Sequence, residues 1–199
     1  AIHQAIQSKI DAMRNAIAIS EWRFCIGAPE GAQAPDYDDR DWQSVRLMHT
    51  WSSADGEAWF RLKPALPSEV EGIDLAGTDL ELDFFLTIGA AVYVNGELRF
   101  REPSWSDTRA VPLPLAPRYQ PAEPLTLVVR CNAGDGFGLF LSAGLRFGRL
   151  ADAIFELDVV RSQFAFTRFL AEAGTAPDAV KSAAWRRAAD ALDLRALER

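Results

Sequence analysis

The sequence has few side chains that suit nucleophilic or metal chemistry: its 199 residues include only two histidines and two cysteines. His3 lies near the N-terminus, so a Ser-His-Asp or Cys-His site would have to depend on His49 alone, and no nucleophile-elbow pattern lies near it. Cys25 and Cys131 lack CxxC spacing and are too few for a disulfide framework. We expect two buried thiols, although a bridge becomes possible if their strands are neighbours.

Several sequence motifs and long apolar runs are also absent. The chain has no glycine-rich phosphate loop, no dinucleotide fingerprint, no HExxH and no GxSxG, so we expect no cofactor. It has no apolar run long enough to span a bilayer and no secretory signal, so we expect a cytoplasmic protein that does not bind membranes. Its net charge of −7 is poorly suited to phosphate backbones, which argues against a nucleic-acid partner.

Both ends of the chain have helical periodicity. The spacing of Ile2, Ile6, Ile10, Met13 and Ile17 predicts an amphipathic helix within residues 1–20. After Arg149 the apolar residues Ile154, Leu157, Phe164 and Leu170 again follow a helical period, and Gly174 suits a helix C-cap. Thr175 and Pro177 suit the start of a further helix, which Trp185, Ala188 and Leu192 continue. Because the chain stops at "LRALER", inside this pattern, we expect residues 150–199 to lead to a downstream domain.

Residues 21–149 have a sequence pattern typical of a β domain, in which short apolar runs alternate with turn residues. The expected strands are Trp22–Ile26, Ala58–Leu62, Asp79–Leu86, Ala91–Val94, Glu97–Arg101, Ala110–Leu115, Leu125–Cys131 and Phe140–Phe147. Such spacing is typical of an antiparallel β-sandwich. Prolines place Ala110–Leu115 at an edge or a bulge. Asn95-Gly96 predicts a type I′ hairpin turn. Gly27–Arg40 is expected to be a loop.

Two groups of carboxylates are candidates for function. "DYDDRDW" places Asp36, Asp38, Asp39 and Asp41 close together, which could form a Ca²⁺ site but also suits a solvated turn that Trp42 anchors to the core. A glycosidase needs two carboxylates across a sugar. Asp107 and Asp135 are the best local candidates, and the alternative for both is a role in turns.

The aromatic residues suggest sugar contacts. Trp51, Trp59, Trp105 and Tyr93 could each stack on a sugar ring, although core packing is the alternative and is favoured for Trp59. Trp105 differs because it lies in the polar stretch "EPSWSDTR". "CNAGDGFG" follows an apolar strand and suits either a ligand loop or a tight connection. The candidate ligand-binding residues are therefore Trp105, Arg109, Asn132 and Asp135.

An ordered set of short motifs resembles a known domain. The set comprises "WRF" at 22–24, "DYDDRDW" at 36–42, "HTW" at 49–51, "AWFR" at 58–61, "VYVNGE" at 92–97 and "LVVRCN" near 127–132. It resembles the jelly-roll, galactose-binding-like "sugar-binding" domain of the β-galactosidase and β-glucuronidase family, which also recurs near the N-terminus of some bacterial α-mannosidases. The resemblance covers about residues 22–147.

This resemblance implies an accessory role. In such enzymes the domain packs beside the catalytic domain, and the flanking helices fit an α-mannosidase-like arrangement better. No catalytic residue matches, so none is transferred. We therefore expect a helix over 1–20, a β-sandwich over 21–149 and helices over 150–199, in a non-catalytic module of a larger glycoside hydrolase. Its expected partners are its own downstream catalytic domain and a carbohydrate. The alternatives are a stand-alone carbohydrate-binding module and a small glycosidase.

Overall fold

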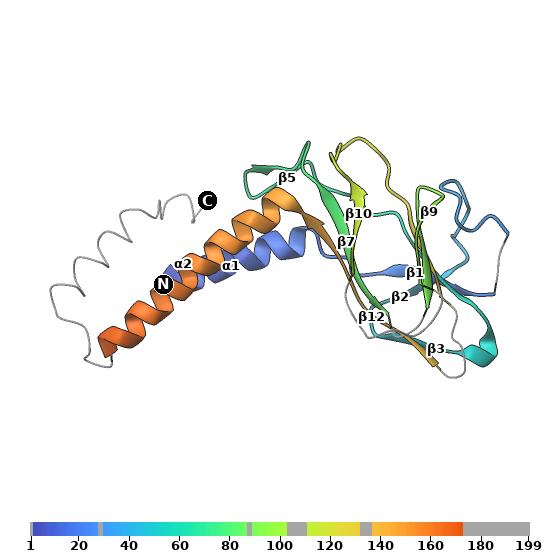
Figure 1. The fold of residues 1–199 in the computed structure, drawn as a ribbon, viewed down its shortest axis with the longest axis horizontal. Helices are drawn as coiled ribbons and strands as arrows, with labels where there is room; N and C mark the ends of the chain where they lie inside the picture. The colour runs from blue at the N-terminus through green and yellow to red at the C-terminus, as the bar shows by residue number, and fades with distance from the viewer. Residues whose placement is uncertain (1, 28–29, 87–88, 103–110, 132–136, 173–199) are drawn as a thin grey trace. The chain divides into compact units, whose positions relative to one another are not determined.

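The computed structural model describes residues 2–27, 30–86, 89–102, 111–131 and 137–172. The fold is mainly β, with antiparallel sheets and two helices (Figure 1). Contacts divide the chain into two compact units. One comprises Ala1–Ala16, Val70–Ile73 and Arg149–Arg199, and the other comprises Ile17–Glu69 and Asp74–Gly148.

The larger sheet has six strands in the order β2-β1-β4-β11-β8-β9. Their bounds are β1 Trp22–Ile26, β2 Gln43–Val45, β4 Ala58–Leu62, β8 Ala90–Val94, β9 Glu97–Glu102 and β11 Leu127–Cys131. Each neighbouring pair is antiparallel. This arrangement agrees with the antiparallel pattern that the alternating short strands predict.

The second sheet has four strands in the order β10-β7-β12-β3. Their bounds are β3 His49–Ser52, β7 Leu80–Leu86, β10 Val111–Ala116 and β12 Phe137–Phe147. A short 3₁₀ helix, η1 (Ser53–Asp55), follows β3, and β5 (Glu69–Val70) and β6 (Ile73–Asp74) form a separate two-stranded ribbon. Within the four-stranded sheet, β10 is an edge strand and its register shifts between Pro114 and Ala116. The prediction that this strand lies at an edge or a bulge is therefore confirmed.

The two larger sheets pack against each other through aromatic side chains. Phe60 of β4 contacts the rings of Phe140 and Trp51 in the other sheet, with centroids 4.8 and 5.3 Å apart. Trp22 also meets Phe140 at 5.1 Å. Edge-to-face packing of this kind adds to the stabilisation from area burial. Trp51 and Trp59 are 5% and 4% exposed, so neither can offer its face to a sugar, and the sequence hypothesis of sugar stacking is wrong for both.

The Asn95-Gly96 turn joins β8 to β9. Asn95 has φ 50° and Gly96 has φ 87°, the positive values that the predicted type I′ turn requires. The turn is fixed to the neighbouring connection, because Asn95 Oδ1 accepts a hydrogen bond from Thr126 N–H at 2.8 Å. Asn95 N–H donates to Thr126 C=O at 2.9 Å. Val92 and Val94 are buried and Tyr93 is only half-buried, as the predicted alternation requires.

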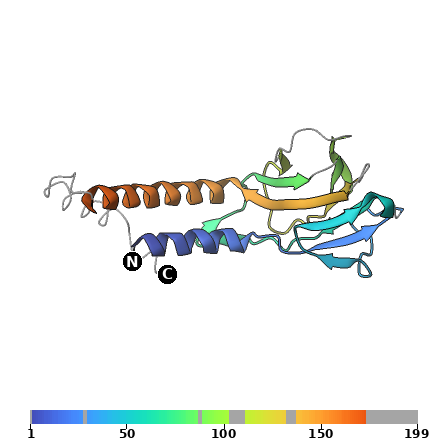
Figure 2. The same cartoon turned by 90° about the horizontal axis from the view of Figure 1, so that it is seen from below.

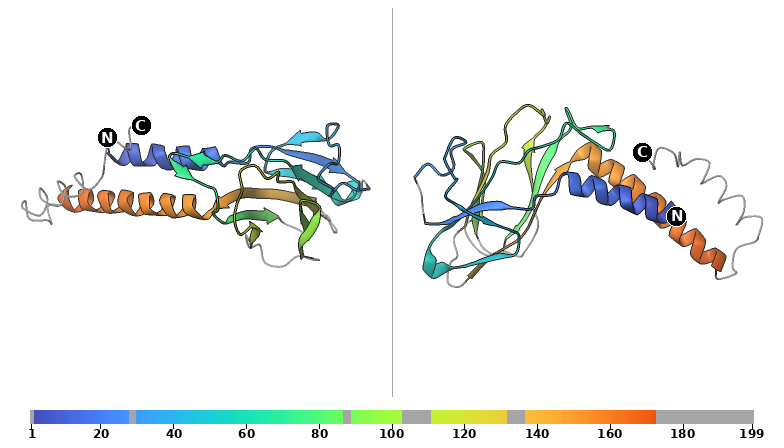
Figure 3. Two further views of the ribbon diagram at one scale, coloured as in Figure 1. Left: turned by 90° about the horizontal axis from the view of Figure 1, so that it is seen from above. Right: turned by 180° about the vertical axis from the view of Figure 1, so that it is seen from behind.

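The helices are α1 (Ile2–Ala16) and α2 (Gly148–Glu172). They run side by side in opposite directions (Figures 2 and 3). Ile6 and Ile10 of α1 pack on Phe164 of α2, and Arg14 forms an ion pair with Asp158 at 3.3 Å. The predicted apolar stripe of the N-terminal helix is thus covered by α2. Neither of these helices is both long enough and apolar enough to span a membrane. The helix expected after Thr175 lies outside the described residues.

Cys25 and Cys131 are free thiols. Cys25 pairs with Trp59 and Cys131 pairs with Ala58, on the two sides of β4. Because Ala58 and Trp59 are consecutive, the two thiols point to opposite faces of the sheet. Burial raises the pKa of each thiol, most of all that of Cys131. The sequence expectation of two buried thiols is therefore confirmed for Cys131 and only partly met by Cys25, which is half-buried.

Candidate functional site

The sequence-derived ligand candidates all lie outside the described residues. These candidates are Trp105, Arg109, Asn132 and Asp135, together with Asp107 of the glycosidase alternative. Strands that flank them, β9 and β11, lie within the described residues. Cys131, the last residue of β11, pairs with Ala90, and Ala90 pairs with Glu102, the last residue of β9. Residues 103 and 132 therefore follow strands that terminate at the same end of the six-stranded sheet, which we call the Cys131 end.

Near the Cys131 end, the described residues include one ion pair over an aromatic ring. Arg130 donates from Nε to Glu57 Oε2 at 2.9 Å and from Nη2 to Glu57 Oε1 at 2.5 Å. Its guanidinium also lies 5.5 Å from the centre of the Trp59 ring. Hydrogen bonding to Glu57 raises the pKa of Arg130. Both carboxylate oxygens of Glu57 are therefore bound by the Arg130 side chain.

A pocket of about 380 Å³ lies at the opposite end of the sheets, which we call the Asn95 end. The Asn95-Gly96 turn contributes Asn95, Glu97 and Arg99, and the connection from β10 to β11 contributes Arg118 and other residues. The remaining lining is largely Leu66, Leu80, Leu115, Tyr119, Gln120, Glu123 and Leu125. The pocket volume is within the range of small-molecule sites. The Asn95-Gly96 pattern predicts the turn, but nothing in the local sequence predicts a pocket beside it.

The chemistry of this pocket suits a small, polar and neutral ligand. Its charged lining residues, Glu97, Arg99, Arg118 and Glu123, balance in formal charge, and Glu97 lies 3.7 Å from Arg99. Amide, guanidinium and carboxylate groups can together bind hydroxyl groups as donors and acceptors. Tyr119 is held in the wall, since its hydroxyl donates to Pro67 C=O at 3.1 Å and burial raises its pKa.

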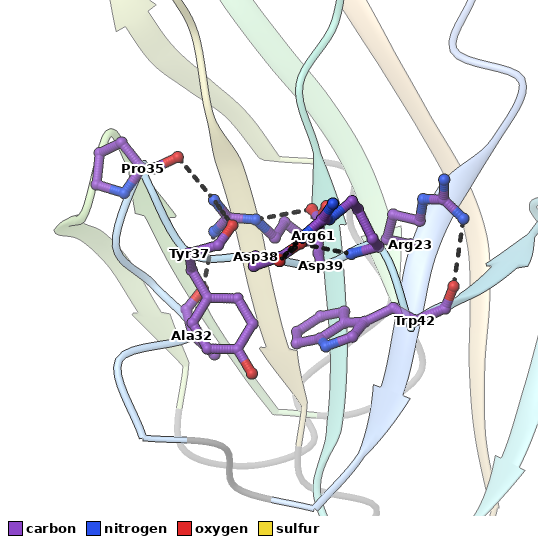
Figure 4. Close-up of polar contacts among 9 residues, drawn as sticks. Arg23, Ala32, Pro35, Tyr37, Asp38, Asp39, Trp42 and Arg61 are labelled. Carbon is purple, nitrogen blue, oxygen red and sulfur yellow. Dashed lines mark hydrogen bonds and ion pairs between the residues drawn. The ribbon is translucent and has the colours of Figure 1, made fainter.

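Arg61 organises the loop that contains the aspartate cluster (Figure 4). Its side chain is fully buried. Nη1 donates to Ala32 C=O at 2.8 Å, Nη2 donates to Pro35 C=O at 3.0 Å, and Nε donates to Asp39 Oδ2 at 2.9 Å. The guanidinium carbon also lies 5.8 Å from the centre of the Tyr37 ring. Arg61 thus fixes residues 31–42, here named the covering loop, against the outer face of β4.

The covering loop buries the outer face of the six-stranded sheet at β1, β4 and β11. Ala32 and Trp42 of the loop pack with Trp59 and Val128 of the sheet. This confirms that Trp42 anchors the loop. Arg61 is not among the sequence-derived candidates, although an arginine within the otherwise apolar run "AWFRL" is a signal for it.

The aspartates of the covering loop are arranged around arginines. Asp39 binds Arg61, and the exposed Asp38 accepts hydrogen bonds from Arg40 Nε at 2.9 Å and Nη2 at 2.6 Å. The hydrogen bonds from Arg40 lower the pKa of Asp38 to about 2. Asp36 and Asp41 are exposed. In the part of the chain that the structure describes, no group of three or more His, Cys, Asp or Glu side chains could hold a metal ion.

His49 packs among aromatic rings. Its ring lies 4.4 Å from that of Phe24 and 6.3 Å from that of Phe60. Desolvation lowers its pKa, because burial disfavours the charged imidazolium. The surroundings of His49 thus suit core packing rather than a proton-transfer role.

Comparison with solved structures finds similar folds in large glycosidases. Bacteroides uniformis β-glucuronidase 2 matches with TM-score 0.55 and 22% identity over 66% of this chain and 17% of its own. A Bacteroides vulgatus β-glycosidase matches with TM-score 0.54 and 18% identity, over 66% of this chain and 20% of its own. A glycosyl hydrolase family 2 member from Bacteroides cellulosilyticus matches with TM-score 0.55 and 17% identity, over 66% of this chain and 20% of its own. No protein-family model and no curated protein matches the sequence.

These likenesses show a shared fold. The matched region spans a fifth or less of each glycosidase chain. The fold therefore resembles one part of much larger enzymes.

Proposed function

We propose that this chain is a non-catalytic accessory module of a larger glycoside hydrolase, with the jelly-roll, galactose-binding-like topology that its motifs resemble. The observation that carries the proposal is the coverage: two thirds of this chain matches only a fifth or less of each glycosidase. A module of this kind would pack beside the catalytic domain of the same polypeptide. The flanking helices support an α-mannosidase-like parent as the more specific form of the proposal.

The described carboxylates support a non-catalytic role. Glu57 binds Arg130, Asp39 binds Arg61, and Glu81 binds Arg146 at 2.7 Å. A glycosidase instead needs two carboxyl groups facing one another across a sugar, roughly 5 to 9.5 Å apart. In each of these three ion pairs the carboxylate already binds an arginine side chain.

Two experiments test the accessory role. The reading frame that encodes this chain is expected to continue into a glycosidase catalytic domain, and a stop codon directly after Arg199 would overturn the proposal. The purified chain should release no nitrophenol from aryl α-mannosides, β-glucuronides or β-galactosides. Turnover that Asp107→Asn or Asp135→Asn abolishes would instead establish the small-glycosidase alternative.

The pocket at the Asn95 end favours a second candidate function, direct carbohydrate binding. Isothermal titration with monosaccharides and oligosaccharides at millimolar concentration tests it. If the pocket binds the sugar, Arg118→Ala should weaken binding and Trp105→Ala should not. The reverse result would assign binding to the sequence-derived candidates, and the exposed Arg46→Ala serves as the control. Absence of heat with every sugar would leave the accessory role without a carbohydrate ligand.

A further inference from the structure

Helix α2 carries apolar side chains on two opposite faces. One face packs on α1 through Phe164, with Ile154, Leu157 and Val160 around it. The opposite face is exposed: Phe155, Val159, Phe166 and Phe169 are 69%, 38%, 61% and 63% exposed. An apolar residue exposed singly is ordinary, but a stripe that contains three phenylalanines usually marks an interaction surface. We call these four residues the phenylalanine stripe.

The spacing of the phenylalanine stripe is that of a helix–helix seam. Its positions, together with Ser162, follow one another in alternating steps of four and three residues. This is the heptad pattern by which one helix packs along another. Ser162 is the small residue within the seam and leaves room for a large side chain from the partner.

We propose that residues 176–199 of the same chain form a helix that packs antiparallel on the phenylalanine stripe. α2 then becomes the middle of three helices. The sequence directly after α2 supports this occupant, because Gly174 suits a helix end, and Thr175 with Pro177 suits a helix start. A connection this short places consecutive helices side by side and antiparallel.

The sequence of residues 176–199 has the matching apolar face. Trp185, Ala188 and Leu192 would share one side of a helix, and Arg186, Asp190 and Asp193 would lie on the other side. At a rise of 1.5 Å per residue the stripe is about 21 Å long, and a helix over 176–199 would be about 35 Å long. The segment is therefore long enough to cover the whole stripe.

In the antiparallel register, the side chains of residues 176–199 complement those of α2 in size and in charge. Counting back from the connection places Trp185 near Ser162, so the largest side chain of the segment meets the smallest residue of the seam. Leu192 falls between Phe155 and Val159. Near the start of α2 the exposed Asp152 and Glu156 flank the stripe, where the basic residues Arg195 and Arg199 would lie. Opposite charges at the rim favour this orientation.

Thiol cross-linking of the full chain tests the inference. In a Cys25→Ser background, Val159→Cys with Ala188→Cys should cross-link within one chain when a short bifunctional thiol reagent is added. The matched control, Val159→Cys with Asp193→Cys, carries the second thiol on the polar side and should remain largely unlinked. Digestion and mass spectrometry identify the joined peptides, and native Cys131 is buried and serves as an internal unreactive thiol.

A second measurement does not depend on introduced thiols. Hydroxyl-radical oxidation of Phe166 and Phe169 should rise severalfold in Trp185→Ser/Leu192→Ser relative to the wild-type chain, and should not change in Arg187→Ser/Asp193→Ser. Cross-links between two chains would overturn the proposal in favour of a second copy as the occupant. Absence of cross-links, together with heavy oxidation of both phenylalanines in the wild-type chain, would show an uncovered stripe and would also overturn it.

Discussion

Phe60 and Arg61 are consecutive residues of β4, and both side chains are fully buried. They face opposite sides of the six-stranded sheet. Phe60 meets the rings of Phe140 and Trp51 on the inner face, whereas Arg61 meets carbonyl groups and Asp39 on the outer face. Both side chains are therefore equally buried, but aromatic packing accommodates Phe60, whereas hydrogen bonds and an ion pair accommodate Arg61.

This difference limits where the β unit can bind a ligand. The inner face is filled by aromatic packing, and at β1, β4 and β11 the outer face is closed by the covering loop. The candidate sites of the β unit lie instead at the two ends of the sheets. The Asn95 end carries the pocket, and the Cys131 end carries the strand termini that precede residues 103 and 132.

The largest expected effect is on the outer face. Arg61→Met should lower the free energy of unfolding by about 3–5 kcal/mol, because it leaves the Asp39 carboxylate and two loop carbonyls without their partner. Urea unfolding followed by tryptophan fluorescence measures this change, since Trp22, Trp42 and Trp59 lie in or against the six-stranded sheet.

Two substitutions in β4 serve as controls for this prediction. Phe60→Leu keeps an apolar side chain on the inner face and should cost only about 1 kcal/mol. Arg61→Lys keeps the charge but cannot reproduce the three-way donor geometry of a guanidinium, so it should recover only part of the stability. Equal costs for Arg61→Met and Phe60→Leu would contradict the proposed difference between the two faces.

The second prediction concerns the inner face. A Cβ atom added at Gly138 would overlap the indole ring of Trp51, a side chain that packs on Phe60. Gly138→Ala should therefore cost about 1–3 kcal/mol by overpacking, in the same urea experiment. Gly144→Ala is the matched control, because an added Cβ meets no atom within 4 Å there. Similar losses in both variants would argue against steric overlap as the cause.

The inner face was the more predictable of the two. Alternation of apolar residues indicates β7 and β8, and a short apolar run indicates β4. Asn95-Gly96 indicates the turn between β8 and β9, and the prolines of β10 indicate that this strand lies at an edge or a bulge. Local sequence determines these features, because a type I′ turn needs positive φ and proline cannot donate to a central ladder. β2 and β3 were missed, since strands of three and four residues carry too little periodicity.

The outer face was less predictable from the sequence, because the residues that bury it lie far away along the chain. Arg61 is buried by residues that lie 22 to 29 positions earlier in the chain, and nothing in "AWFRL" specifies that contact. The pocket at the Asn95 end is assembled from the turn and the connection from β10 to β11, whose proximity depends on strand order. Motif resemblance pointed correctly to a glycosidase-like fold, while the residues of a ligand site remain predictions.

The third prediction uses an ion pair that is only partly buried. The side chains of Arg130 and Glu57 are 35% and 28% exposed. A double-mutant cycle with Arg130→Met and Glu57→Gln should therefore give a coupling energy of about 0.5–1 kcal/mol, well below the Arg61 effect. Raised salt should reduce this coupling, because solvent reaches the pair. If the Arg130–Glu57 coupling energy were as large as the loss of unfolding free energy in Arg61→Met, the extent of burial would not explain the difference in strength between the two ion pairs.

The smallest effect concerns Asp38, an exposed neighbour of Asp39 in the same covering loop. Hydrogen bonds from Arg40 lower the pKa of Asp38 from its ordinary 3.8 to about 2. A carboxyl group with a lowered folded-state pKa stabilises the loop above its ordinary pKa, and that contribution is lost as the pH falls through 2. Carboxyl-carbon NMR should give a midpoint near pH 2 for Asp38, and Arg40→Gln should move it toward 3.8. An identical midpoint in both proteins would mean that Arg40 does not hold the Asp38 carboxylate in solution.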